Sequence, residues 1–220
     1  YIQNSIWWVE YANLDGIRMD TYPYNDRDAM AKWAKAITNE YPNLNIMGEA
    51  WLASSQDIAF WQKDATNPLK YNSQLPTVMD FMTERALETC FNEHGKPWED
   101  KGMNRLYNTI ANDYLYANVN NLLVFAENHD TQRHNHLLNS DITKYKMAMA
   151  FIMTTRGIPQ IYYGSEIGMT GNKDKGDGDI RRDFPGGWSG DSINAFSANG
   201  RTAIQNEYYS YMSKLLNWRK

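Results

Sequence analysis

The chain has 220 residues, a formal net charge of −4 and a single cysteine, Cys90. The length suits one large domain or two small ones, and the lone cysteine excludes an intrachain disulfide. The slightly acidic balance gives no support for a nucleic-acid or membrane-surface partner, and no apolar run reaches the roughly 18 residues of a membrane span.

Helical patterns and short apolar strands alternate along the chain. Strands are predicted at residues 14–19, 44–49, 77–81, 121–126 and 157–164. Helices are predicted at residues 2–12, from the caps Asn25 and Asp26 to the break at Pro42, and at 55–63, 83–92, 103–117, 141–155 and 202–218, with loops at 64–76 and 168–200. This alternation indicates an α/β fold with a parallel sheet covered by helices.

Two architectures fit that pattern, an open doubly wound sheet and a (β/α)8 barrel. No glycine-rich phosphate fingerprint follows the first strand, which weakens the nucleotide-binding version of the open sheet. Polar side chains follow three strands, at Asp20, Glu49 and Asp130. Several strands that each give one polar residue favour the barrel.

The stretch Leu14 to Asp20 is predicted to be a buried strand that presents a carboxylate at its end. Arg18 lies two residues before Asp20, so both side chains point to the same face of a strand. A guanidinium beside a carboxylate keeps it ionised and aimed, which suits a nucleophile. A purely structural ion pair fits this stretch equally well.

Glu49 and Asp130 are two further candidates for catalytic carboxylates. Glu49 precedes Trp51, and partial desolvation against that ring would raise the pKa of Glu49 and suit it to be an acid. One ionised and one protonated carboxyl form the arrangement of glycosidases. A divalent-metal site with Asp20, Glu49, Asp130 and His129 as ligands fits the residues equally.

Four segments then resemble a known family. Residues 15–20 (DGIRMD), 47–51 (MGEAW), 125–130 (FAENHD) and 157–166 (GIPQIYYGSE) resemble the strand-4, strand-5, strand-7 and strand-8 motifs of the α-amylase superfamily, glycoside hydrolase family 13. The motifs occur in the family's order and span nearly the whole chain. Within the family the chain most resembles the neopullulanase or cyclomaltodextrinase branch.

The resemblance implies a role for each matched residue. Asp20 would be the nucleophile of a retaining mechanism with a glycosyl-enzyme intermediate. Glu49 would be the general acid and then the base, and Asp130 would stabilise the transition state. Arg18 would orient the nucleophile, and His129 would bond a sugar hydroxyl. The implied partner is an α-1,4-glucan such as starch, maltodextrin or cyclodextrin. A transglycosylase or isomerase on the same scaffold, and a non-catalytic glycan-binding relative, remain the alternatives.

One departure concerns the region beside the nucleophile. The family commonly has a His four residues after it, and this chain has Tyr24. Tyr22 and Tyr24 are predicted to form a stacking platform for the leaving-group side, because aromatic rings stack on sugar faces. Trp51 and Asn128 complete the predicted substrate-binding residues.

A larger departure is that the family's strand-3 motif does not occur. The five strands would then be the fourth to eighth of the barrel, without strands 1 to 3 and the C-terminal β-domain. Residues 1–220 are thus predicted to be the C-terminal part of the catalytic barrel, as a single-domain fragment that is at most weakly active alone. A periplasmic or secreted location is expected from the supply of glucan.

The other titratable residues that the sequence singles out are not expected to be catalytic. The acidic stretch 174–179 resembles a calcium loop only faintly and is expected to be solvated, so no cofactor is assigned and Ca²⁺ is a candidate only for the full-length enzyme. This stretch is followed by Arg181, Arg182 and Asp183, which loosely match a substrate-contacting segment of the family. His134 and His136 are expected in a loop without metal. Core-facing helix positions are predicted at Met147, Met149, Phe151, Met153, Tyr208, Tyr211, Leu215 and Trp218.

Overall fold

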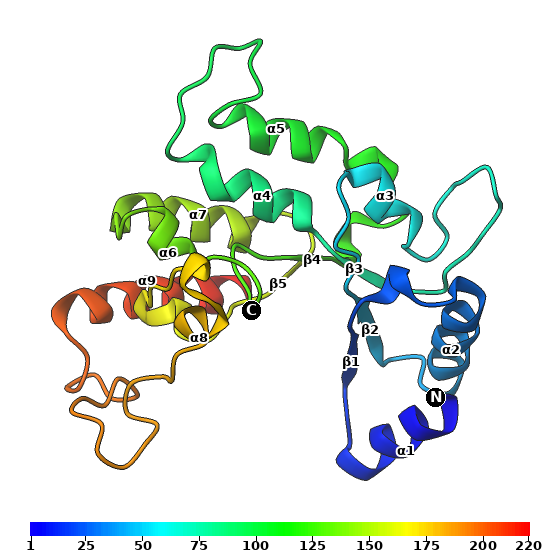
Figure 1. Cartoon of the computed structure of the whole chain (residues 1–220), viewed down its shortest axis with the longest axis horizontal. Coiled ribbons are helices and arrows are strands. Elements are labelled where there is room, and N and C mark those ends of the chain that lie inside the picture. The colour runs from blue at the N-terminus through cyan, green and yellow to red at the C-terminus, as the bar shows by residue number, and fades with distance from the viewer. The chain divides into compact units, whose positions relative to one another are not determined.

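The computed structural model describes all 220 residues, from Tyr1 to Lys220 (Figure 1). The chain forms two compact units, and each has its own buried apolar side chains. Unit 1 comprises residues 1–82, 107–124 and 156–158, and unit 2 comprises residues 83–106, 125–155 and 159–220. No helix in the chain combines the length and the apolarity that crossing a membrane requires.

A five-stranded sheet follows the order of the chain, which confirms the predicted α/β fold. Its strands are β1 (Gly16–Met19), β2 (Asn45–Gly48), β3 (Thr77–Met79), β4 (Leu122–Val124) and β5 (Ile158–Pro159), in the order β1-β2-β3-β4-β5. The first four pair in parallel, with Arg18 opposite Met47 and Val78 opposite Leu122. Because β1 and β2 are parallel neighbours, their carboxyl ends lie at the same edge of the sheet.

Helices of unit 1 form where the apolar spacing predicts them. They are α1 (Ile2–Ala12), α2 (Arg27–Glu40), α3 (Ser55–Phe60) and most of α5 (Asn104–Ala111). Helix α5 ends earlier than the predicted helix 103–117, and a 3-10 turn at Asp113–Leu115 follows it. Asp26 caps α2 by accepting the N–H of Ala29 at 2.8 Å. The buried face of α2 carries Met30, Trp33, Ala34 and Ile37. The indole N–H of Trp33 donates to the Ser5 hydroxyl at 2.9 Å and so fastens α2 to α1.

The prediction that the first strand is buried is wrong. Residues of β1 alternate between exposed and half-buried, and Leu14 just before it is exposed. The physical reason is position, because β1 is the first strand of the order and has a neighbouring strand on one side only. The buried strands of the sheet are β3 and β4, which have a neighbour on each side.

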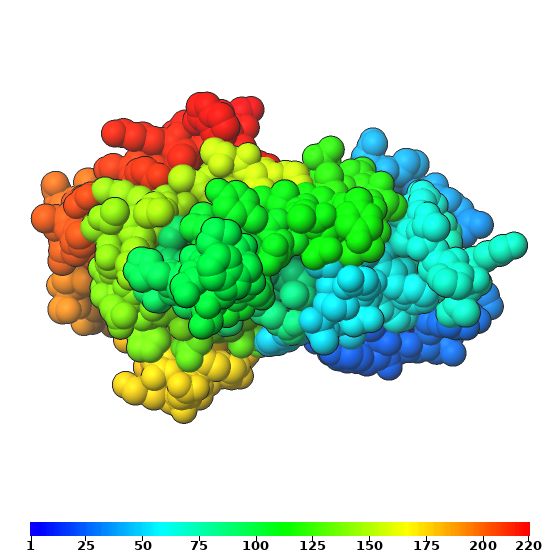
Figure 2. Space-filling model, turned by 90° about the horizontal axis from the view of Figure 1, so that it is seen from above, coloured from blue at the N-terminus to red at the C-terminus, as the bar shows by residue number.

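Unit 2 is mostly helical. Its helices are α4 (Phe81–Cys90, which begins in unit 1), α6 (His134–Leu137), α7 (Ile142–Thr154), α8 (Asp177–Ile180) and α9 (Ala203–Arg219). Helices α7 and α9 pack against each other, and the rings of Tyr145 and Tyr208 meet edge to face at 4.9 Å (Figure 1). In Figure 2 the segment 184–200 (orange) adjoins α9 (red), and the Asn206 amide donates to the Ala198 carbonyl at 3.0 Å.

Three structural predictions for unit 2 need correction. His134 and His136 lie in the short helix α6 and not in a loop, and the predicted loop 168–200 contains α8. Met147 and Trp218 are exposed, although both were expected in the core. Met147 and Met149 are two residues apart, so on a helix their side chains diverge, and only Met149 is buried.

Candidate active site

In unit 1 one guanidinium joins two carboxylates. Asp20 directly follows β1, and Glu49 directly follows β2. Arg18 on β1 donates from Nη1 to Asp20 Oδ1 at 2.6 Å and from Nη2 to Glu49 Oε2 at 2.5 Å. The parallel pairing of β1 and β2 places the three residues at one strand edge, which confirms the predicted pairing of Arg18 with Asp20 and adds Glu49 to it.

The two carboxylates differ sharply in exposure. The side chain of Asp20 is 64% exposed, whereas that of Glu49 is 7% exposed. A guanidinium remains charged and presents its N–H bonds in a rigid fork, so it holds both groups in fixed directions. Since Arg18 occupies the space between the two carboxylates, a metal ion does not fit there. No three His, Cys, Asp or Glu side chains of the chain are grouped so as to hold one.

Close packing beneath β2 fixes the backbone of Glu49. A Cβ on Gly48 would lie 2.5 Å from Leu75 Cδ2 and 3.2 Å from Tyr22 Cγ, so any larger residue here would have to displace the buried Leu75 side chain. The Glu49 N–H donates to the Met19 carbonyl at 2.9 Å, and the Tyr22 N–H donates to the Glu49 carbonyl at 3.0 Å. These bonds tie the segments after β1 and β2 together.

The predicted stacking platform needs one correction. Tyr22 is fully buried, its hydroxyl donates to the Ser73 carbonyl at 3.1 Å, and its ring meets Trp61 edge to face. It supports the turn and presents no face to a ligand. Tyr24 is exposed, as a stacking residue must be, and its hydroxyl donates to the Trp51 carbonyl at 3.0 Å. The Trp51 ring stacks on Phe81, with centroids 4.9 Å apart.

In unit 2 the residues after β4 form a tight turn around Asp130. Asn128 Oδ1 accepts the N–H groups of Asp130 at 2.8 Å and of Thr131 at 3.1 Å. In return the Thr131 hydroxyl accepts the Asn128 N–H at 2.9 Å. Asn128 was predicted to bind substrate, but its side chain is buried and its oxygen is used within the turn. It therefore positions Asp130.

Both oxygens of Asp130 have a partner. His129 Nε2 lies 2.9 Å from Oδ2, and Arg181 Nη2 lies 2.6 Å from Oδ1. Arg181 Nε also donates to the His129 carbonyl at 2.7 Å. The sequence suggested Arg181 only through a loose match to the family. Its contact with Asp130 was not predicted, because 51 residues separate the two. His129, which was predicted to bond a sugar hydroxyl, thus forms a trio with Asp130 and Arg181.

A buried polar cluster lies just before this turn. The carboxylate of Glu127 accepts hydrogen bonds from Arg133, the Ser165 hydroxyl and the His134 N–H. Burial raises the pKa of Glu127, while the Arg133 guanidinium opposes that shift. Arg133 also stacks over the Tyr162 ring at 3.9 Å. Sequence reasoning missed this cluster, which joins residues 127–134 to residues 162–165. Its effect is to fix the chain immediately before Asn128.

Comparison with known proteins decides the family. The family model described as "Alpha amylase, catalytic domain" matches residues 3–207. The chain belongs to the alpha-amylase family. All four recognised motifs lie within the matched residues.

Relatives of this alpha-amylase family chain cover more than one activity by name. A cyclomaltodextrin glucanotransferase from Geobacillus stearothermophilus is 30% identical over 79% of the chain and 23% of its own length. A cyclomaltodextrinase from Thermoanaerobacter pseudethanolicus is 27% identical over 76% of the chain and 27% of its own length. An Anoxybacillus alpha-amylase structure matches with a TM-score of 0.74 at 22% identity, over the whole chain and 44% of its own. The chain therefore spans less than a third of the two curated relatives and less than half of the solved structure, in agreement with the predicted partial barrel.

The acidic stretch of this alpha-amylase family member does not fit a calcium ion. The Asp177 carboxylate pairs with the Lys173 ammonium and with Arg181, and Asp179 accepts the Asn172 N–H at 2.6 Å. The hydrogen bond from Lys173 lowers the pKa of Asp177, and the bond from Asn172 lowers that of Asp179. Protein donors already occupy the oxygens that a hard cation would need.

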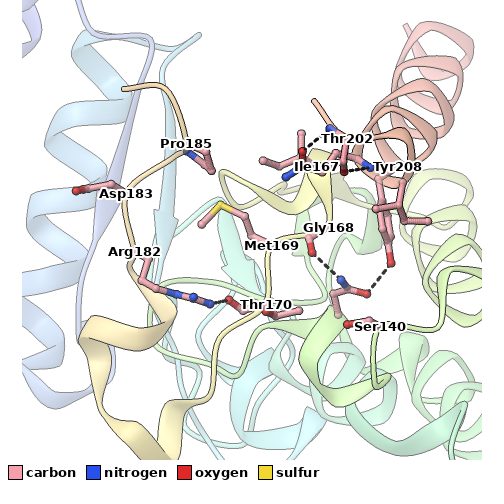
Figure 3. Close-up of a pocket in the computed structure, with 13 residues that line it drawn as sticks. Ser140, Ile167, Gly168, Met169, Thr170, Arg182, Asp183, Pro185, Thr202 and Tyr208 are labelled. Carbon is pink, nitrogen blue, oxygen red and sulfur yellow. Dashed lines mark hydrogen bonds between the residues drawn. The ribbon is translucent and has the colours of Figure 1, made fainter. Parts of the chain in front are cut away.

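A cavity of about 420 Å³ in unit 2 lies apart from the predicted site residues (Figure 3). Its lining includes Arg182, which donates to the Thr170 carbonyl, and Thr202 at the start of α9. Asn135 and Tyr208 also line it, and the Tyr208 hydroxyl donates to Asn135 Oδ1 at 3.0 Å. None of the predicted catalytic or binding residues lines it.

Proposed function

We propose that this chain carries the catalytic carboxylates of a retaining glycoside hydrolase that acts on α-1,4-glucans such as starch, maltodextrin or cyclodextrin. The observation that carries the proposal is the single Arg18 guanidinium bonded to both Asp20 and Glu49. It joins both carboxylates to one side chain, and this supports a retaining mechanism, in which the two carboxyl groups lie only about 5–5.5 Å apart. An inverting enzyme needs a wider gap, with room for water.

The two environments suit two roles. The exposed Asp20 carboxylate attacks the anomeric carbon and forms a glycosyl-enzyme, while Glu49 gives its proton to the departing glycosidic oxygen. Glu49 then takes a proton from water, whose oxygen attacks the same carbon and releases Asp20. Arg18 keeps the nucleophile aimed throughout. Asp130, held by His129 and Arg181, stabilises the positive charge of the transition state.

Transfer to a sugar acceptor is the second candidate. It is favoured by the relatives named cyclomaltodextrin glucanotransferase, one of which is 30% identical. Hydrolysis and transfer share the first half-reaction and differ in whether water or a sugar hydroxyl attacks the glycosyl-enzyme. We place either activity in the periplasm or outside the cell, where polymeric glucan is supplied.

The test compares Asp20→Asn and Glu49→Gln in the full-length protein, with maltoheptaose and α-maltosyl fluoride as substrates. We expect both variants to lose maltoheptaose turnover, Glu49→Gln by about 10²–10⁴-fold. Fluoride leaves without a proton, so Glu49→Gln should still form the glycosyl-enzyme from α-maltosyl fluoride, while Asp20→Asn should not. The matched control is Asp15→Asn, an identical change five residues earlier in the same motif, which should retain activity.

Two results would contradict the proposal. Wild-type turnover by Asp20→Asn would remove the nucleophile assignment. A first product of inverted anomeric configuration, observed by NMR before mutarotation, would exclude retention. Product analysis with added glucose separates the two candidates, because a transglycosylase lengthens or caps the acceptor and a hydrolase leaves it unchanged.

A further inference from the structure

A ladder of opposite charges runs from the surface of unit 2 to Asp130. Lys173, Asp177 and Arg181 are spaced four residues apart, with Lys173 in the 3-10 turn before α8, Asp177 at the start of α8 and Arg181 directly after its end. The Lys173 ammonium bonds the Asp177 carboxylate, and Asp177 Oδ2 lies 3.0 Å from Arg181 Nη2. The same Nη2 atom lies 2.6 Å from Asp130 Oδ1. The ladder therefore ends on the predicted transition-state carboxylate.

Arg181 has the geometry of a clamp. It donates from Nε to the His129 carbonyl and from Nη2 to Asp130, so its planar fork grips a backbone and a side-chain oxygen of adjacent residues. The second Asp130 oxygen faces His129 Nε2 at 2.9 Å. With one partner on each oxygen, the plane of the carboxylate is set. An ammonium on a flexible stem cannot grip both points at once.

We infer that Arg181 is a positioning residue, which fixes the direction of the Asp130 carboxylate, and that Asp177 holds Arg181 in place. This inference rests on the proposed function, in which Asp130 acts on the transition state. Misplacement of a catalytic group by about 1 Å costs up to about 10²-fold in rate, so loss of the clamp acts mainly on kcat.

The neighbouring arginine provides a matched control. Arg182 donates from Nη2 to the Thr170 carbonyl (Figure 3) and from Nε to the Asp179 carbonyl at 3.0 Å. Its guanidinium lies 3.9 Å from the Asp179 carboxylate and forms no ion pair with Asp130. Both arginines are adjacent in sequence and carry the same charge. A general effect of charge or of loop stability would therefore appear in both.

The experiment measures kcat and KM for maltoheptaose in the full-length protein with Arg181→Gln, Arg181→Lys and Arg182→Gln. We expect Arg181→Gln to lower kcat by about 10–100-fold with KM changed by less than about threefold. Arg181→Lys should recover part of the loss, because it restores the charge beside Asp130 without the fork. Arg182→Gln should stay within about twofold of wild type. Asp177→Asn should lower kcat by a few-fold. The same change should have a smaller effect in the Arg181→Gln variant, because Asp177 acts by holding Arg181.

Comparison with Asp130→Asn separates the inference from the proposed function. If Asp130→Asn is inactive but Arg181→Gln behaves like Arg182→Gln, the clamp is refuted and the function stands. If Asp130→Asn retains wild-type turnover, the role of Asp130 fails and the clamp with it. A rise in KM at unchanged kcat would assign Arg181 to direct substrate binding and overturn the positioning role.

Discussion

At the scale of single residues, His134 links stability to pH. It is fully buried, and neither ring nitrogen has a hydrogen-bond partner. Burial lowers its pKa to about 4, whereas an unfolded histidine titrates near 6.5. Between these values the unfolded chain binds a proton that the folded chain does not. The folded state is fully favoured above about pH 6.5, and about 3 kcal/mol is lost as the pH falls to about 4.

We expect His134→Leu to remove this dependence. At neutral pH the variant should be as stable as wild type or more so, because no buried polar atom is left unpaired. Urea unfolding near pH 7 and pH 4.5 measures the effect, and the wild type should lose about 2–3 kcal/mol more than the variant. His136→Leu is the control, since that side chain is exposed and its change should leave the wild-type dependence in place. Equal losses in wild type and His134→Leu would contradict the assignment.

The same scale shows what the motifs could and could not predict. Arg18, Asp20 and Glu49 follow adjacent parallel strands, so their grouping follows from local sequence and strand order. The burial of Tyr22 does not, because it depends on packing against Trp61 and Ser73, some forty to fifty residues away. The spacing of a motif predicts which residues lie together at the carboxyl edge of the sheet. The exposure of each side chain depends on packing against segments outside the motif.

At the scale of elements, helix α9 has a complete capping box. The Thr202 hydroxyl accepts the Gln205 N–H at 3.3 Å, and the Gln205 side chain accepts the Thr202 N–H at 2.9 Å. Because both bonds satisfy N–H groups that lack a helical partner, Thr202→Ala should cost about 1 kcal/mol. Thr202→Ser keeps the hydroxyl and should cost less. Urea unfolding followed by far-UV circular dichroism compares the two, and an equal loss would show that the hydroxyl is not responsible.

Element prediction succeeded where local signals are strong. The ends of α2, α7 and α9 coincide with the caps Asp26, Asp141 and Thr202, which the sequence displays directly. It failed for α8, a single turn whose Gly and Asp composition is typical of loops and whose charged pairs form only after folding. The prediction that β1 is buried also failed, because a short apolar run does not show whether a strand lies at the edge or in the centre of a sheet.

At the scale of the whole molecule, the chain passes repeatedly between the two units, so unit 1 is assembled from three separate segments. Arg156 fastens these segments together. Its Nη1 donates to Asp80 Oδ2 at 2.8 Å, just after β3, and its Nη2 donates to Asp113 Oδ1 at 2.6 Å. Each of the three residues comes from a different segment of unit 1. The network is also largely buried, with Arg156 only 11% exposed.

Arg156→Met should therefore lower the free energy of unfolding by about 3–5 kcal/mol, because it leaves two carboxylates facing an apolar side chain. Arg156→Lys should lose less, since it keeps the charge but not the bidentate grip on Asp113. Arg105→Met is the matched control. Arg105 also pairs with two acidic residues, but it and its main partner Glu93 are each about 30% exposed, so about 1 kcal/mol or less is expected. Urea unfolding of the three variants measures these losses. Similar losses of unfolding free energy for Arg156→Met and Arg105→Met would contradict the prediction, because the buried network that joins the three segments would then stabilise the chain no more than an exposed ion pair does.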